Sequence, residues 1–181
     1  METSFRMTDS QFREAFYIHK DVLYRFAYRM TGLHDFAEDV VQDAFAVLWK
    51  DGGASYDEGR GALRSYLLGI VRNLVLKRWR KRHPDQSLDD EGFAGNLAVT
   101  PPVDLERLEL SQAVAEAVQS LPPLQREVLI LAEYEQMPLF EIALATGSEL
   151  AAVKSRLHRA RENLRRALRP LLEANIGVER S

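Results

Sequence analysis

Apolar residues recur at intervals of three and four along the chain, and no stretch alternates between apolar and polar residues. A spacing of three and four gathers side chains on one face of an α-helix, whereas alternation is the pattern of a half-buried strand. The clearest example is the series Phe12, Phe16, His19, Leu23, Phe26 and Met30. The sequence therefore predicts an all-α fold.

Three helices are expected in residues 8–83, which we predict to pack as one small domain. Thr8 with Gln11 has the spacing of a capping box, and Asp35 with Glu38 marks the start of the second helix. The three helices are expected to end at Gly32, at the Gly52-Gly53 break and at Arg82, the third beginning at about Arg60.

Residues 84–104 are rich in Pro, Gly and Asp and have no sustained periodicity, so they are predicted to form a flexible acidic linker. Residues 105–172 are then predicted to form a second small helical domain. Its four helices are expected at about 104–120, 124–134, 139–146 and 150–172.

Charge is segregated along the chain. The formal net charge is −3, but residues 1–83 carry +3, residues 84–149 carry −11 and residues 150–181 carry +5. Charges further apart than roughly 8 to 10 Å are screened in salt, so binding responds to the local field. The acidic total therefore does not exclude a polyanionic partner.

Composition excludes several classes of function. The chain has no cysteine, so disulfides, thiolate zinc sites and cysteine nucleophiles are excluded. Its 4 histidines lack metal-ligand spacing, and no catalytic constellation is visible. We expect no metal, no cofactor and no enzymatic activity. With no signal peptide and no apolar run near the roughly 20 residues of a membrane span, the protein is expected to be soluble and cytoplasmic.

A helix-turn-helix is predicted near the C-terminus. Ala143, Gly147 and Val153 have its spacing, with Ser148 as a possible N-cap of the second helix. On that helix a buried stripe is expected at Val153, Leu157, Ala160, Leu164 and Leu168. The opposite face carries Lys154, Ser155, His158 and Arg159. Such side chains can read base edges in the major groove, although an ordinary solvated basic face is the equally weighted alternative.

Two further surfaces lie in the first domain. The third helix combines aromatic, amide and basic side chains, which suits unpaired bases and phosphates, although each aromatic residue alone fits a core role as well. These residues are Tyr66, Arg72, Asn73, Lys77, Arg78, Trp79 and Arg80. The second helix has an acidic face that suits a basic partner helix or is simply exposed. It carries Asp39, Gln42 and Asp43 beside Val40.

Taken in order, four segments resemble the extracytoplasmic-function (ECF) group of bacterial RNA polymerase sigma factors. "AEDVVQDAF" is similar to the polymerase-binding helix and "VRNLVLKRWRKR" to the helix that recognises and melts the −10 element. "LPPLQREVLILAEYEQMPLFEIA" and "VKSRLHRARENLRRAL" resemble the −35-binding domain. The resemblance covers about residues 10–170.

The resemblance implies partners and roles for these surfaces. Core RNA polymerase would bind Asp39, Val40, Gln42 and Asp43, and Asn73 would help to capture a flipped −10 base beside the loop 55–63. Base edges of the −35 element would meet Lys154, His158 and Arg159, with Arg156 and Arg161 on phosphates. An anti-sigma factor, often membrane-anchored in this group, is a further expected partner.

The sequence departs from the family pattern at several positions. Ala152 stands where Thr is usual, Pro138 replaces a small polar cap, and Lys77 stands where an acidic residue is common. Two alternatives remain open: a dimeric helix-turn-helix regulator that acts without polymerase, and a sigma mimic that titrates an anti-sigma factor. A sigma mimic needs no basic recognition face, so the retained Lys154 and Arg159 count against it.

Overall fold

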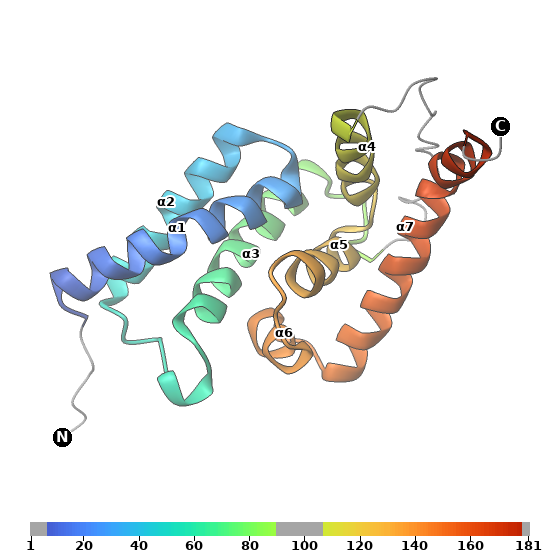
Figure 1. Cartoon of the computed structure of the whole chain (residues 1–181). Coiled ribbons are helices and arrows are strands. Elements are labelled where there is room, and N and C mark those ends of the chain that lie inside the picture. The colour runs from blue at the N-terminus through green and yellow to red at the C-terminus, as the bar shows by residue number, and fades with distance from the viewer. Residues whose placement is uncertain (1–6, 90–106, 179–181) are drawn as a thin grey trace.

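A computed structural model describes residues 7–89 and 107–178, and within them every regular element is a helix. The predicted all-α class is confirmed. The N-terminal unit consists of α1 (Asp9–Thr31), α2 (His34–Asp51), the short 3₁₀ turn η1 (Glu58–Arg60) and α3 (Leu63–Arg82). The C-terminal unit consists of α4 (Arg107–Gln119), α5 (Pro123–Leu129), the π-helical turn η3 (Ile130–Tyr134), α6 (Leu139–Thr146) and α7 (Leu150–Val178) (Figure 1).

The ends of α1 follow the sequence closely. The Thr8 hydroxyl accepts from the Gln11 N–H at 3.3 Å and the Gln11 side chain accepts from the Thr8 N–H at 2.9 Å, which confirms the capping box. Gly32 ends the helix with φ 71°, a left-handed conformation that glycine adopts without strain. Local chemistry therefore predicts both ends of this helix.

The predicted start of α2 is wrong by one residue. The helix begins at His34, and Leu33 precedes it without a side-chain cap, so Asp35 lies inside the first turn. The His34 ring stacks on Tyr28, with 4.3 Å between the ring centroids, and its Nδ1 bonds the Tyr24 hydroxyl. This tertiary anchor on α1 fixes the start of α2.

The third helix also starts later than predicted, at Leu63 rather than near Arg60. The Asp57 carboxylate accepts from the Gly59 N–H at 2.9 Å and caps the separate turn η1. Gly61 then has φ 156°, which breaks the helical path before α3 begins.

The predicted helix 124–134 changes type halfway along. It begins at Pro123 as α5 and continues from Ile130 as the π-helical turn η3, where the Glu135 N–H donates to the Ile130 carbonyl at 3.1 Å. Insertions of this kind are frequent at functional sites. Here the π-helical turn delivers Glu135 to the face of the N-terminal unit.

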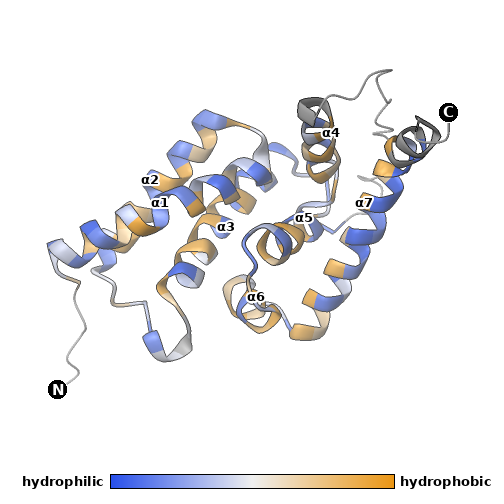
Figure 2. Cartoon of the chain, in the orientation of Figure 1, coloured by the Kyte–Doolittle hydropathy of each residue, from blue (hydrophilic) through white to orange (hydrophobic). Residues whose placement is uncertain are grey.

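Helix α7 runs to Val178, beyond the predicted end at residue 172 and through Pro170. The predicted buried stripe is confirmed, because Val153, Leu157 and Ala160 are buried and Leu164 packs against the same core. Figure 2 shows the hydrophobic and hydrophilic sides of this helix. Most of its basic side chains are consequently exposed.

The two units pack against each other in the described residues. Helix α3 contacts α6, and α1 contacts α4 and α5, so one hydrophobic core runs through both units (Figure 1). Residues 84–89 of the predicted linker form turns on the C-terminal unit, where the Leu88 carbonyl accepts from the Leu124 N–H at 3.2 Å. Residues 90–104 of that linker lie outside the described residues.

Candidate nucleic-acid and polymerase interfaces

The acidic face predicted on α2 lies at the surface. Asp39, Gln42 and Asp43 are exposed, whereas the side chain of Val40 is fully buried in the core. The structure therefore brings three of the four predicted partner-binding residues together and places Val40 beneath them.

Arg78 joins this acidic face to the basic helix α3. Its Nη2 lies 3.1 Å from Asp43 Oδ2 and its Nη1 lies 3.9 Å from Asp39 Oδ2. The guanidinium also covers the Phe36 ring, 4.9 Å from its centroid. Because these ion pairs are exposed, each contributes little stability, about 0–1 kcal/mol. A partner can therefore replace them at small cost.

Five of the seven predicted −10 residues of α3 fall into two groups, and the other two, Arg72 and Arg78, form ion pairs. Asn73, Lys77 and Arg80 are exposed, and their spacing of four and three places them on one face of the helix. Tyr66 and Trp79 are only partly exposed: Tyr66 lies against Tyr56, and Trp79 stacks on the ring of His83. The polar group forms the accessible surface, and the two aromatic residues support it.

Arg72 is turned toward the C-terminal unit. Its Nε and Nη2 donate to the Glu127 carboxylate at 2.7 and 3.0 Å, and its Nη1 donates to Asn73 Oδ1 at 3.0 Å. Glu127 is fully buried and Arg72 is 15% exposed. Sequence periodicity could not predict this pair, because 55 residues separate the partners.

The loop 55–63 packs beside the start of α3. Tyr56 and Tyr66 lie with 5.7 Å between their ring centroids. Burial raises the pKa of both phenols, with smaller contributions from nearby carboxylates, among them Glu58 for Tyr56 and Asp51 for Tyr66. Both hydroxyls therefore keep their protons at neutral pH and remain hydrogen-bond donors.

The helix-turn-helix is formed by α6 and α7. Gly147 makes the turn with φ 62° and donates to the Leu144 carbonyl. The predicted N-cap Ser148 is wrong, because α7 starts at Leu150 and the Glu149 carbonyl accepts its first bond, from Val153 N–H at 3.1 Å. The Ser148 hydroxyl instead accepts from Arg156 Nη1 at 2.9 Å.

The exposed surface of α7 carries four of the six predicted −35 residues. Lys154, Ser155 and His158 are exposed near the start of the helix. Arg161 is exposed as well, but its Nε donates to Glu133 Oε1 at 2.9 Å. The first turns of α7 therefore present side chains that can meet base edges, and Arg161 lies beside them.

The other two predicted −35 residues meet a carboxylate from the chain itself. Asp89 Oδ2 lies 4.0 Å from Arg156 Nε and 3.9 Å from Arg159 Nη2. Asp89 belongs to the docked residues 84–89, which the sequence assigned to a flexible linker. This contact could not be foreseen from helical periodicity.

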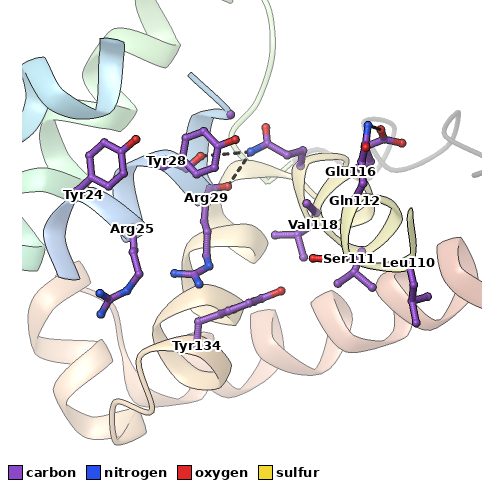
Figure 3. A pocket seen from close by; sticks show the side chains of 14 residues that line it. Tyr24, Arg25, Tyr28, Arg29, Leu110, Ser111, Gln112, Glu116, Val118 and Tyr134 are labelled. Atoms are coloured by element: carbon purple, nitrogen blue, oxygen red, sulfur yellow. Dashed lines mark hydrogen bonds between the residues drawn. The ribbon is translucent and has the colours of Figure 1, made fainter. Parts of the chain in front are cut away.

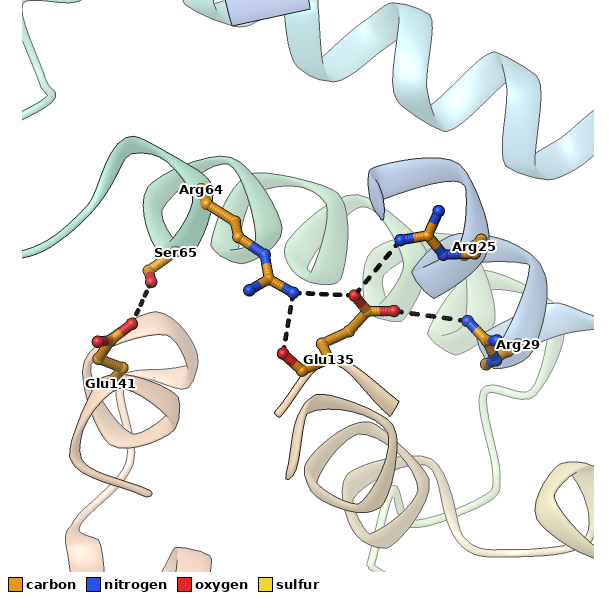
Figure 4. Close-up of polar contacts among 6 residues, drawn as sticks. All are labelled: Arg25, Arg29, Arg64, Ser65, Glu135 and Glu141. Carbon is orange, nitrogen blue, oxygen red and sulfur yellow. Dashed lines mark hydrogen bonds and ion pairs between the residues drawn. The ribbon is translucent and has the colours of Figure 1, made fainter. Parts of the chain in front are cut away.

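A second set of charges holds the units together (Figure 4). Glu135 is 3% exposed, and its carboxylate lies 3.9, 3.4 and 2.9 Å from the guanidinium groups of Arg25, Arg29 and Arg64. Arg64 also donates to the Glu135 carbonyl at 2.9 Å. Three arginines of one unit thus converge on a single carboxylate of the other.

Burial shifts the pKa of two neighbouring charged groups. Burial raises the pKa of Glu127, opposed by Arg72 and Arg156. Burial lowers the pKa of Arg126 to about 10. Arg126 donates to the carbonyls of Met30, Gln119 and Leu121, the last at 2.9 Å, and stays charged at neutral pH. The charged groups of this interface therefore keep hydrogen-bonded partners.

A groove of about 1070 Å³ lies elsewhere, between α1 and α4 (Figure 3). Arg29 and Tyr134 both line it, with the guanidinium carbon 4.4 Å from the ring centroid. None of the predicted site residues lines this groove. It adjoins the Glu135 cluster at Arg25 and Arg29.

We predict that the stability of the folded chain falls less between pH 7.5 and pH 5.5 in His19→Gln than in wild type. Burial, with Arg64 nearby, lowers the pKa of His19 in the folded chain. Below the ordinary pKa of 6.5 the unfolded chain then binds more protons, so stability falls as pH falls. Urea midpoints at pH 7.5 and 5.5 should differ less for His19→Gln than for wild type. Equal differences would contradict the assignment.

Within residues 7–89 and 107–178, no cluster of three His, Asp or Glu side chains is arranged to bind a metal ion. No helix in those ranges combines the length and the apolar character that a membrane span requires.

Comparison with known families divides the chain in two. The model for Sigma-70 region 2 matches residues 16–84, and the model for Sigma-70 region 4 matches residues 111–164. The ECF RNA polymerase sigma factor SigW of Bacillus subtilis (strain 168) is 34% identical over 165 residues, which cover 85% of this chain and 87% of that protein.

Solved structures give the same result. The sigma factor RpoE in complex with the anti-sigma factor NepR from Bartonella quintana is 28% identical, with a TM-score of 0.69 over 88% of this chain and 98% of that chain. CnrH in complex with the cytosolic domain of CnrY is 26% identical, with a TM-score of 0.64 over 89% of both chains.

Proposed function

The chain belongs to the ECF family of RNA polymerase sigma factors, and we propose that its two units read the two promoter elements separately. As a member of that family it directs transcription initiation by RNA polymerase and is not an enzyme.

The region 2 unit would bind core polymerase through the exposed Asp39, Gln42 and Asp43 of α2. Beside this face, α3 would bind the −10 element through Asn73, Lys77 and Arg80, with Tyr66 and Trp79 behind them. An amide among cationic side chains suits one base edge flanked by phosphates. Strand separation would follow from capture of unstacked bases, without nucleotide hydrolysis.

The region 4 unit would read the −35 element with the first turns of α7. Lys154, His158 and Arg159 would contact base edges beside the exposed Ser155, and Arg156 and Arg161 would neutralise phosphates. The observation that carries the proposal is that both matched regions present a basic helix with a polar exposed face. Neither helix needs all of its polar side chains for the fold.

The two structural relatives were solved with anti-sigma partners, which supports an anti-sigma factor as a regulator of this chain. We propose that this chain acts in the cytoplasm, where promoter DNA and polymerase meet. That partner would have to compete with core polymerase or with DNA for one of the surfaces described above.

We expect Lys154→Ala with Arg159→Ala to lower run-off transcription at least tenfold on templates that the wild type selects from a randomised promoter library. Each lost base contact costs about 1–3 kcal/mol. Arg165→Ala with Arg166→Ala removes the same charge from exposed positions further along α7 and should reduce yield far less. Equal losses from the two pairs would refute the −35 assignment. No core-dependent transcript from wild type would refute the proposed function.

A further inference from the structure

A pocket rich in arginine lies where the ends of α1 and α3 and the start of α2 meet the C-terminal unit. Its volume is about 210 Å³, and its lining includes Arg78, Arg82 and His83 at the end of α3 and Arg126 of α5. No Asp or Glu of the described residues lines it. A pocket that gathers cationic side chains without carboxylates has a positive local field, which attracts small anions.

Arg126 is a buried charge whose described partners are all neutral. It is 5% exposed, and its guanidinium donates to the backbone carbonyls of Met30, Gln119 and Leu121. Its Nε is buried without a hydrogen-bond partner in the described residues. Burial alone lowers its pKa to about 10, and no carboxylate in residues 7–89 and 107–178 opposes that shift. Buried charges in proteins are normally paired, so an anion in the pocket would supply the missing counter-charge.

Arg78 and Arg82 lie one turn apart on α3 and approach the same aromatic ring. Their guanidinium carbons are 4.9 and 5.6 Å from the Phe36 centroid. Arg78 also pairs with Asp39 and Asp43, but neither carboxylate lines the pocket. Arg82 forms no ion pair with any described residue. A guanidinium held against a ring keeps its plane fixed and offers its N–H groups as a fork, which matches the oxygens of a phosphate.

The aromatic rings and the size of the pocket narrow the class of ligand. Trp79 and His83 line it beside Phe36, and their rings stack with 4.7 Å between the centroids. Because roughly 10–15 Å³ of such space holds one water, 210 Å³ accommodates more than a monatomic ion. Aromatic faces stack on nucleobases, and guanidinium groups bind phosphates. The two kinds of side chain together suit a nucleotide.

We propose that this pocket binds the phosphate group of a small molecule between Arg78 and Arg82, with Arg126 balancing its charge, and that a nucleoside monophosphate binds more tightly than free phosphate because its base packs on Trp79. Promoter recognition requires no such ligand, so the site is additional to the proposed function. The ligand would contact both units, since Arg126 belongs to α5 and the other two arginines belong to α3.

Isothermal titration calorimetry of the full chain, in phosphate-free buffer at physiological ionic strength, tests the proposal. AMP, GMP, CMP and UMP are titrated separately, and inorganic phosphate and adenosine represent the two parts of the ligand. We expect one site per chain and a dissociation constant below about 1 mM for at least one nucleotide. Inorganic phosphate should bind about tenfold more weakly, and adenosine should not bind.

Two calorimetric results would contradict the proposal. Phosphate that binds as tightly as every nucleotide would overturn the contribution of the base. The absence of binding by all five phosphate compounds, or binding of adenosine as tight as that of AMP, would overturn the phosphate site itself.

Substitutions at two neighbouring positions separate the pocket from the general charge of α3. Arg82→Gln removes one guanidinium from the pocket and should weaken nucleotide binding about tenfold. Arg82→Lys keeps the charge but loses the planar fork, so its affinity should fall between those of wild type and Arg82→Gln. Lys81→Gln is the matched control, because Lys81 is exposed and does not line the pocket, and it should change affinity less than about twofold. Equal weakening by Arg82→Gln and Lys81→Gln would show unspecific attraction and overturn the site.

Tryptophan fluorescence shows whether the ligand lies in this pocket. The chain has 2 tryptophans, so Trp49→Phe leaves Trp79 as the only one. Trp49 packs against Phe12 near the end of α2 and does not line the pocket. We expect the tightest nucleotide to change the emission of Trp79 with the dissociation constant that calorimetry gives. A nucleotide that binds in calorimetry but leaves this emission unchanged would lie elsewhere and overturn the assignment. These measurements need neither polymerase nor promoter DNA, so they test the site independently of the proposed function.

Discussion

Arg126→Met should lower the free energy of unfolding by about 2–4 kcal/mol. Arg126 is 5% exposed, and its guanidinium donates to three backbone carbonyls: of Met30 near the end of α1, of Gln119 at the end of α4 and of Leu121 after it. Methionine fills similar volume but leaves these oxygens without donors, at about 1–3 kcal/mol each. Removal of a desolvated charge offsets part of that cost.

Thermal or urea unfolding followed by circular dichroism measures the effect of Arg126→Met. For a chain of this size, each kcal/mol of lost stability lowers the thermal midpoint by about 2–4 °C, so the midpoint should fall by roughly 4–16 °C. Arg25→Met is the matched control, because Arg25 is 51% exposed and its ion pair with Glu135 is long at 3.9 Å. Equal losses of unfolding free energy from the two variants would show that the carbonyl contacts of Arg126 do not stabilise the fold more than an exposed ion pair does.

Local sequence rules were sufficient for most of the fold. The capping box at Thr8, the left-handed glycines Gly32 and Gly147 and the buried stripe of α7 follow from interactions within a few residues. The exposed faces of α2 and α7 follow from the same periodicity. These features are local, so each leaves a readable pattern.

The features that sequence could not reveal are those that join distant segments. Glu127 and Arg72 are 55 residues apart, and Glu135 and Arg29 are 106 apart. Neither glutamate interrupts a helical pattern in a way that marks it as buried. The predicted start of α2 was wrong for the same reason, because contacts with Tyr24 and Tyr28 of α1 hold His34 in place.

The same limit applies to the candidate site. Periodicity identified Asn73, Lys77, Lys154 and His158, which are exposed. It gave no warning that Arg72 is occupied by the other unit. Helical periodicity predicts which face of a helix is polar. Only the tertiary structure shows which polar face packs against another part of the chain.

Asp39→Arg with Asp43→Arg should weaken binding to core polymerase about 100-fold. Both carboxylates are exposed on one face of α2, where the proposed partner is a basic helix. Reversal replaces two attractions by like-charge repulsion, which costs several kcal/mol, and 100-fold corresponds to about 2.7 kcal/mol. Fluorescence anisotropy of labelled protein titrated with core polymerase, without DNA, measures this directly.

Two comparisons separate the polymerase contact from indirect effects. Glu14→Arg with Asp21→Arg makes the same change in net charge on exposed positions of α1 and should leave affinity within about threefold of wild type. Asp39→Asn with Asp43→Asn frees Arg78 without repelling it, because Arg78 pairs with both carboxylates. If the partner recognises the negative charges, the neutral pair should fall between wild type and the reversed pair. A neutral pair as weak as the reversed pair, in a chain of unchanged stability, would mean that the geometry set by Arg78, and not the charge of the face, determines binding.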